Sequence, residues 1–203
     1  MSELPYLTED EMLKIIYIDP GHGGTDPGAV YRGLHEKDVT LNLACRLYEK
    51  LWLSGFSVFL TRLQDVYTSL SQRVFLCNEI HFKFLDMSPK EVFISLHINA
   101  DPDTDQVGMP EARGEEIFYY TPRGKRIADF LKEQVDSFFP DQPFRGLKVA
   151  PFYVLKHTIM PAVLVECGFI DHRKTASKLK DPVVLDHIAF CLTNGLKNYF
   201  TAL

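Results

Sequence analysis

Three runs of apolar residues, rich in β-branched and aromatic side chains, each lead into a side chain capable of metal or acid–base chemistry. The runs are Lys14 to Ile18, Val92 to Leu96 and Ala162 to Val165, and the side chains that follow them are His22, His97 and Glu166. Apolar runs of this length, separated by helical patterns, are typical of buried strands in a mostly parallel sheet. Because open α/β sheets bind ligands at the carboxyl ends of their strands, we expect the three side chains to meet at one edge.

The alternation of such runs with helical patterns predicts the fold class. We expect an α/β protein of three layers, α/β/α, with a mostly parallel central sheet of about six strands. The chain has 203 residues, 46% of them hydrophobic, which suits one domain over residues 1–203 with an N-terminal extension at 1–13. Further strands are expected at Phe56 to Leu60, Glu116 to Tyr120 and Phe152 to Leu155, and helices at Asp38 to Leu53, Ser71 to Leu85, Arg123 to Phe139 and Pro182 to Phe200.

Composition excludes several classes of partner. The net charge is −5 and no basic residues cluster, which argues against a nucleic-acid binder. No apolar stretch is long enough to span a membrane, and the acidic N-terminus, broken by Pro5, lacks the features of a signal peptide. We therefore expect synthesis in the cytoplasm and no membrane partner. The four cysteines are widely spaced and are predicted to be reduced.

Two imidazoles and one carboxylate form the usual ligand set of a catalytic zinc, which keeps a further position open. His22 and His97 supply the imidazoles. Glu36 precedes the first predicted helix and could reach the same edge as Glu166, so two carboxylates are available. Burying Glu166 unpaired in so apolar a run would be costly, which favours a functional role for it, either as a base or as a ligand.

Asp19, three residues before His22, has two interpretations. It either shapes the Asp-Pro-Gly turn or accepts the second ring proton of a ligand histidine. Asp26 begins another Asp-Pro-Gly sequence and is interpreted as a turn residue.

Several short motifs follow one another in a fixed order from about Lys14 to the carboxyl terminus. They are Ile16-Tyr-Ile-Asp-Pro-Gly-His-Gly-Gly-Thr-Asp-Pro-Gly-Ala29, Leu60-Thr-Arg62, Ser71-Gln-Arg73, Ile94-Ser-Leu-His-Ile-Asn-Ala100, Arg145-Gly-Leu-Lys148, Tyr153-Val-Leu155 and Met160-Pro-Ala-Val-Leu-Val-Glu-Cys-Gly-Phe-Ile170. In these motifs the chain resembles the zinc-dependent N-acetylmuramoyl-L-alanine amidases of the Amidase_3 type. The resemblance implies a peptidoglycan hydrolase that cuts the amide between the lactyl group of N-acetylmuramic acid and the L-alanine of the stem peptide.

The resemblance also implies roles for individual residues. The zinc ligands would be His22, Glu36 and His97, and Glu166 would be the catalytic base and then the acid. The family pattern Gly-x-x-Glu before a helix matches Gly33 to Glu36 and selects the carboxylate over the adjacent His35, although zinc accepts either side chain.

Two other functions compete with an amidase. A related zinc carboxypeptidase or aminopeptidase would share the metal chemistry, and a wall-binding module would hold a structural metal. The module is disfavoured because a structural zinc normally has four protein ligands.

A phage endolysin or another lytic enzyme that is released to act on the wall fits a chain without a visible leader. The negative charge favours delivery by a wall-targeting domain absent from this chain. Residues 101–113 contain two prolines and no apolar helical stripe that could plug the site, which predicts a constitutively open site.

Overall fold

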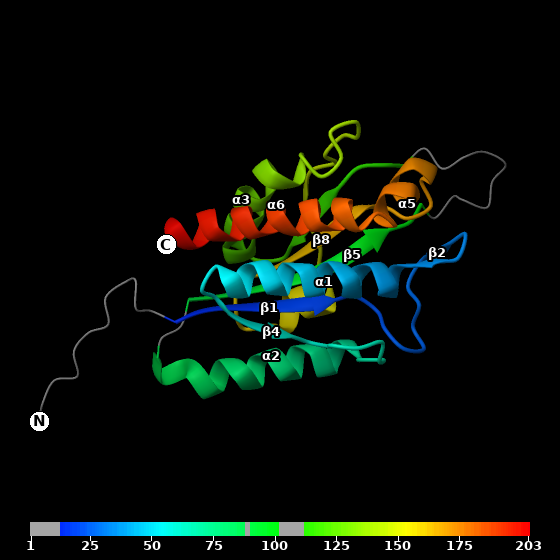
Figure 1. The fold of residues 1–203 in the computed structure, drawn as a ribbon. Coiled ribbons are helices and arrows are strands. Elements are labelled where there is room, and N and C mark those ends of the chain that lie inside the picture. The colour runs from blue at the N-terminus through cyan, green and yellow to red at the C-terminus, as the bar shows by residue number, and fades with distance from the viewer. Residues whose placement is uncertain (1–12, 88–89, 102–111) are drawn as a thin grey trace, which may run out of the picture.

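A six-stranded sheet with the order β4-β1-β5-β8-β6-β7 forms the middle layer of the molecule (Figure 1). The computed structural model describes residues 13–87, 90–101 and 112–203. All neighbouring strands are parallel except β6 and β8, which are antiparallel. The predicted α/β fold with a mostly parallel sheet of about six strands is confirmed. The strands are β1 (Lys14–Pro20), β4 (Ser57–Leu60), β5 (Lys90–Asn99), β6 (Glu116–Tyr119), β7 (Leu147–Val149) and β8 (Ala162–Phe169).

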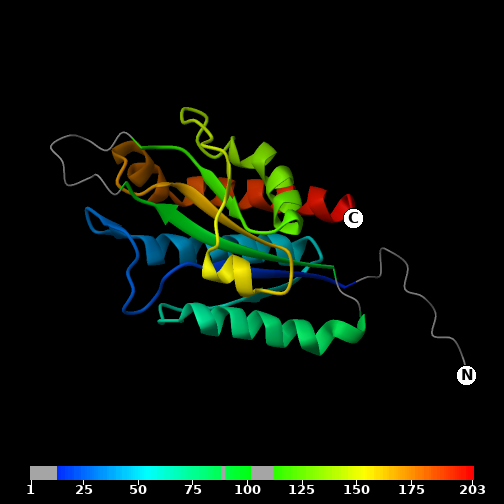
Figure 2. The same cartoon turned by 180° about the vertical axis from the view of Figure 1, so that it is seen from behind.

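Helices cover both faces of this sheet, as the two opposite views show (Figures 1 and 2). One face packs against α1 (Glu36–Leu53), α3 (Pro122–Val135) and α6 (Pro182–Thr201), and the other against α2 (Leu70–Phe84) and α4 (Tyr153–His157). Strand residues alternate between the two faces, so Ile16 and Ile18 join the first core and Ile15 and Tyr17 the second. The remaining elements are a small hairpin of β2 (Val30–Tyr31) and β3 (Leu34–His35), a 3-10 turn η2 (Leu85–Met87) and α5 (Arg173–Leu179).

The structure differs from the prediction in one expected strand and in one strand of the sheet that was not expected. The prediction of a strand at Phe152 to Leu155 is wrong, because Tyr153–His157 form α4, which buries Val154 and Leu155 and leaves its N-cap Phe152 exposed. Four apolar residues do not distinguish a strand from one helical turn, and packing against α2 decides the outcome. The sixth strand is β7 instead, whose three side chains are partly or fully exposed and carry no apolar signal.

Strands β5 and β8 also run further than predicted. The apolar runs end at Leu96 and Val165, but the ladder continues to Asn99 and Phe169, so His97 and Glu166 lie inside paired strands. The backbone continues as a strand because the residues that point to the opposite face of the sheet, toward α1, α3 and α6, remain apolar. Ile98 and Cys167 are both buried there. Both side chains are therefore held by rigid sheet rather than by loops.

Among the described residues, no helix combines the length and apolar character that a membrane crossing requires. Cys77, Cys167 and Cys191 are buried, Cys45 is exposed, and all four are free thiols, as predicted. The predicted extension at 1–13 lies outside the described residues except for Leu13. Most of the stretch 101–113 also lies outside them, so the open site remains a prediction.

Candidate active site

The register of the sheet places several polar side chains on one face, the face that α2 and α4 cover. Asp19 of β1 pairs with Ser95 of β5, and His97 of β5 pairs with Glu166 of β8. Glu166 also pairs with Glu116 of β6. Because paired residues point to the same side of a sheet, these side chains form a row across four strands.

The loop after β1 holds His22 in an unusual backbone conformation. His22 has a φ of 60°, in the left-handed region that non-glycine residues rarely adopt. Arg73 of α2 stabilises this conformation, because its Nη2 donates to the carbonyl of His22 at 2.6 Å and its Nη1 to the carbonyl of Pro20 at 2.6 Å. The buried guanidinium thus fixes the direction in which the His22 ring projects.

Asp19 does not contact a candidate ligand histidine, so the proposed proton-accepting role is wrong. Its Oδ1 accepts hydrogen bonds from Arg73 Nη1 at 2.7 Å and Thr61 Oγ1 at 2.5 Å, and its Oδ2 from Ser95 Oγ at 2.7 Å. Burial alone would raise the pKa of Asp19, but the Arg73 guanidinium and these hydrogen bonds hold that pKa below its usual range. The carboxylate therefore serves as the buried counter-charge of Arg73.

The partner of His22 is Asp26, which sequence reasoning missed. Asp26 Oδ2 lies 2.9 Å from Nδ1 of His22, while its Oδ1 accepts a hydrogen bond from the backbone N–H of Gly28 at 3.1 Å. One carboxylate thus shapes the turn and orients the ring. The only signal in the sequence was the spacing of four residues from His22.

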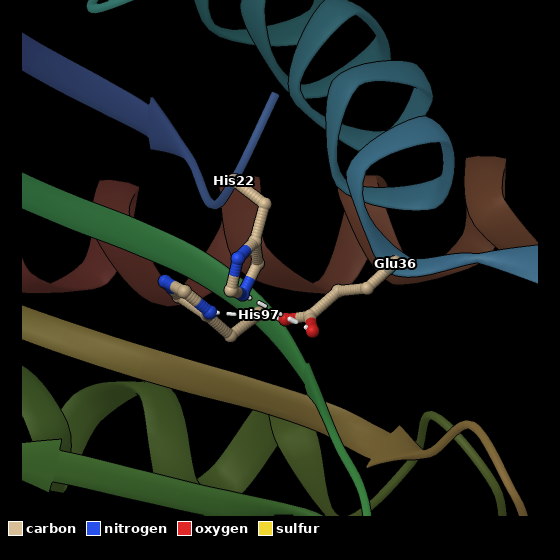
Figure 3. Close-up of side chains that lie close together, drawn as sticks. All are labelled: His22, Glu36 and His97. Atoms are coloured by element: carbon tan, nitrogen blue, oxygen red, sulfur yellow. Dashed lines mark hydrogen bonds and ion pairs between the residues drawn. The ribbon is translucent and has the colours of Figure 1, made fainter. Parts of the chain in front are cut away.

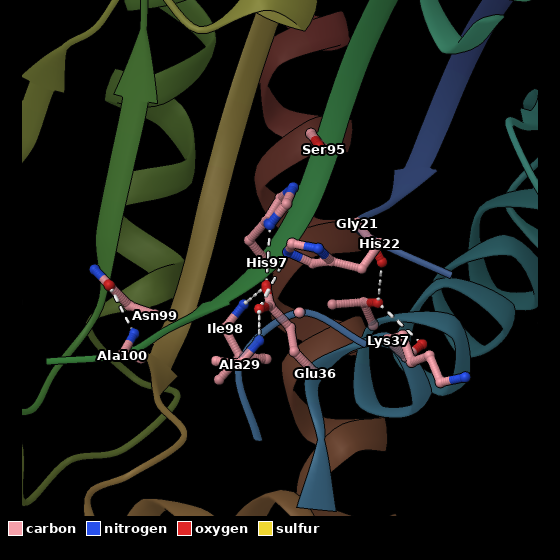
Figure 4. Close-up of polar contacts among 12 residues, drawn as sticks. Gly21, His22, Ala29, Glu36, Lys37, Ser95, His97, Ile98, Asn99 and Ala100 are labelled. Atoms are coloured by element: carbon pink, nitrogen blue, oxygen red, sulfur yellow. Dashed lines mark hydrogen bonds and ion pairs between the residues drawn. The ribbon is translucent and has the colours of Figure 1, made fainter. Parts of the chain in front are cut away.

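His22 and His97 converge on the carboxylate of Glu36 (Figure 3). His22 Nε2 lies 3.1 Å from Glu36 Oε2, and His97 Nδ1 lies 3.0 Å from Glu36 Oε1. The same two oxygens accept hydrogen bonds from the backbone N–H groups of Ala29, at 2.9 Å, and Ile98, at 3.0 Å (Figure 4). Burial opposes ionisation of Glu36, but hydrogen bonds from the two imidazoles bring its pKa well below the usual range.

This group could hold a metal ion. One potential ligand atom from each of His22, Glu36 and His97 lies within 4.8 Å of the others. Two glycines make room for them: a Cβ at Gly21 would lie 2.4 Å from the His97 ring, and a Cβ at Gly28 would lie 2.6 Å from Glu36 Oε2. Gly28 also has a φ of 65°, so a larger residue at position 28 is disfavoured both by this backbone conformation and by the contact with Glu36. The donor set and its close packing fit the predicted ion.

His35, the alternative ligand, lies away from this group. It is the N-cap of α1, its side chain is 41% exposed, and its Nδ1 lies 3.6 Å from Asp38 Oδ2. Glu36, as the first residue of α1, points inward instead and is buried. A carboxylate at a helix N-terminus is also favoured by the helix dipole.

Glu166 lies beside the group without joining it. The residue is partly buried, and its Oε2, which is fully buried, has no hydrogen-bond partner in the part of the chain that the structure describes. Burial raises the pKa of Glu166 to about 7; His97 opposes this effect, and the negative charges of Glu36 and Glu116 add to it. A carboxyl group that gains and loses a proton near neutral pH is suited to general acid–base catalysis.

A cavity of about 330 Å³ opens over this part of the sheet. His22, His97 and Glu166 line it, so the two candidate ligand histidines and the Glu166 carboxyl group face the same space. Its outer walls come from the start of α2 and from α4, and they are largely apolar. The wall residues include Tyr67, Leu70, Phe152 and Tyr153.

Comparison with known proteins agrees with this geometry. Residues 16–198 match the family described as N-acetylmuramoyl-L-alanine amidase, Amidase_3. The chain belongs to this family. It is 35% identical over 189 residues to the N-acetylmuramoyl-L-alanine amidase LytC of Bacillus subtilis, covering 91% of this chain and 35% of LytC. It is 31% identical over 196 residues to the germination-specific amidase of the same organism, covering 93% of this chain and 80% of that protein.

Solved structures of family members have the same architecture. An N-acetylmuramoyl-L-alanine amidase from Clostridium difficile 630 superimposes with a TM-score of 0.82 at 30% identity, covering 94% of this chain and 98% of that one. AmiC2 of Nostoc punctiforme gives a TM-score of 0.80 at 31% identity, with 93% and 97% covered. The chain thus matches these solved amidases over nearly their whole length but spans about a third of LytC.

Proposed function

We propose that this chain hydrolyses the amide bond between the lactyl group of N-acetylmuramic acid and the L-alanine of the stem peptide in peptidoglycan. In this proposal His22, Glu36 and His97 hold a zinc ion and Glu166 transfers the protons. One observation carries it: three potential ligands from separate segments meet beside Glu166, whose Oε2 is buried and has no hydrogen-bond partner among the described residues. Family membership and the names of the relatives support the choice of bond.

The chemistry of the three side chains suits zinc. With zinc bound, Nδ1 of His22 would carry a proton and donate it to Asp26, which would leave the electron pair of Nε2 for the ion. When bound, zinc polarises the scissile carbonyl and makes water a stronger nucleophile at neutral pH. Three protein ligands leave a coordination position open, as catalytic sites require.

Glu166 moves one proton twice in this mechanism. As water attacks the carbonyl carbon, the carboxylate accepts a proton from it, and the resulting acid then donates that proton to the alanine nitrogen as the C–N bond breaks. The products are a carboxyl group on the lactyl ether and a free amino group on L-alanine. Because β8 pairs with strands on both sides, Glu166 is held in place for both transfers.

Residues 1–203 act, in this proposal, as one catalytic domain at the cell wall. Domains outside this chain would deliver it to the wall, in agreement with the length of LytC relative to the match. Control through delivery also fits a site that needs no activator.

The experiment is digestion of purified peptidoglycan by the zinc-loaded protein. We expect new amino groups of L-alanine without new reducing sugar ends, and intact stem peptides in the mass spectrum. Chelator should abolish cleavage and Zn²⁺ should restore it. Release of free D-alanine would indicate a carboxypeptidase instead, and sedimentation with the wall without any cleavage would indicate a binding module.

A further inference from the structure

We propose that Arg145 and Lys148 bind a carboxylate of the stem peptide and so determine which way the substrate lies across the site. The carboxylate is that of the second residue, next to L-alanine. This inference rests on the proposed function and adds a binding subsite to it.

The two basic residues are held by one buried acid. Oε1 of Glu116 accepts hydrogen bonds from Arg145 Nε at 2.5 Å and from Lys148 Nζ at 2.6 Å. Oε2 of Glu116 accepts a further hydrogen bond from Asn99 Nδ2 at 3.1 Å, and the Asn99 side chain is itself fixed by the N–H of Ala100 at 2.8 Å (Figure 4). The pair is therefore oriented before any ligand arrives.

One carboxylate does not neutralise two cations. Lys148 alone would balance Glu116, so the cluster keeps a net positive charge. The side chains of Arg145 and Lys148 are 37% and 39% exposed, so both reach solvent. Among the described residues, no acceptor bonds to the two terminal nitrogens of Arg145. These nitrogens and the ammonium group remain available to a carboxylate, which guanidinium binds with two parallel hydrogen bonds.

The sheet places this charge at a defined distance from the reaction. Glu116 is the direct cross-strand neighbour of Glu166, and Lys148 on β7 pairs with Phe118, two residues along from Glu116 on the same face. Neighbouring strands lie about 4.8 Å apart, so the cations lie about one to two strand spacings beyond Glu166. His22, Glu36 and His97 lie on its opposite side.

The substrate carries an anion at a matching distance. The scissile nitrogen belongs to L-alanine, and the next residue is a glutamate joined through its γ-carboxyl group, so its α-carboxyl group is free or amidated. Consecutive α-carbons are about 3.8 Å apart, which puts this carboxyl group about 6 Å from the scissile nitrogen. With Glu166 at the scissile nitrogen, the peptide then runs over β6 and β7. The sugar lies toward the aromatic wall that includes Tyr67 and Tyr153.

The test compares two soluble N-acetylmuramoyl tripeptides, with lysine as third residue, that differ only in the free or amidated carboxyl group of residue two. The wild-type protein should cleave the free acid with a kcat/KM roughly tenfold higher than that for the amide. Arg145→Gln and Lys148→Gln should each raise KM for the acid and reduce this ratio, with little effect on the amide. Arg145→Lys should keep part of the preference. The matched control is Lys125→Gln on the exposed side of α3, where Lys125 pairs with Asp129; this variant should leave both rates unchanged.

Other outcomes separate the alternatives. If the cations only neutralise Glu116, both substrates lose rate equally and the melting temperature falls, which overturns the proposal. If the preference follows a carboxylate on residue three, seen with a diaminopimelate-for-lysine pair, the assignment to residue two is wrong. A wild-type protein that cleaves all substrates equally refutes the subsite alone, whereas one that cleaves none refutes the proposed function.

Discussion

Glu115, the residue before β6, has a buried carboxyl group without a hydrogen-bond partner among the described residues. Its side chain is 0% exposed, and neither oxygen has a hydrogen-bond partner among the described residues. Burial, together with the negative charge of Asp136, raises the pKa of Glu115 to about 8. Glu115→Gln keeps the size of the side chain and removes its ability to ionise, so the effect of the charge on stability can be measured.

The sign and size of the effect follow from this pKa. The folded protein binds the proton of Glu115 more tightly than the unfolded chain does. The contribution of this proton to the stability of the fold is therefore complete below about pH 4.5 and is lost as the pH rises through about 8. A rise in the pKa of Glu115 from 4.5 to about 8 corresponds to an upper limit of about 5 kcal/mol for the cost of ionising this side chain in the folded protein. Since local relaxation reduces the cost, we expect the Gln variant to be more stable than wild type by about 2 kcal/mol at pH 9.

Urea unfolding of both proteins in chelator, followed by circular dichroism at pH 5, 7 and 9, measures this difference. The gain in free energy of unfolding should be near zero at pH 5 and should grow with pH. Glu133→Gln, on the exposed side of α3, is the control and should change stability little at any pH. A constant difference between wild type and Glu115→Gln across this range, or a less stable variant at pH 9, would refute the reasoning.

Three further predictions concern the site. Glu36→Ala should lose bound zinc and His35→Ala should keep it, as measured by metal analysis after dialysis; the reverse result would make His35 the ligand. Glu166→Gln should retain stoichiometric zinc and lose roughly 10²-fold or more in kcat, whereas loss of the metal would identify Glu166 as a ligand. Arg73→Met should lower the free energy of unfolding by about 3–5 kcal/mol because it leaves the Asp19 carboxylate buried without its cation. Asp19→Asn in the same chain should recover part of that loss, and purely additive losses in the double variant would contradict the ion pair.

The sequence by itself determined the fold class and the order of most elements. Strand and helix periods are local properties, because alternation of two and of about 3.6 residues comes from the backbone alone. The runs around Ile16, Val92 and Val163 therefore predicted three central strands. The motifs likewise predicted which side chains approach one another: His22, Glu36 and His97 converge in the structure, beside Glu166.

Local reasoning failed where weak segments depend on their neighbours. Phe152 to Leu155 has the composition of a strand, yet it forms α4 because Val154 and Leu155 pack against α2. Leu147–Val149 has no strand pattern, yet it forms β7 because β6 offers a free edge for hydrogen bonding. In both cases contacts with residues distant in the sequence outweigh a small intrinsic preference.

The tertiary structure alone decided how the polar side chains are paired. Asp19 and Asp26 begin identical Asp-Pro-Gly sequences, but one is the counter-charge of Arg73 and the other orients His22. Arg73 lies 54 residues from Asp19, and the Arg145 that contacts Glu116 lies 29 residues away. The energy of a buried charge depends on which opposite charge and which hydrogen-bond donors surround it. Those neighbours are brought together only when the strands align in register, and no local pattern in the sequence records that alignment.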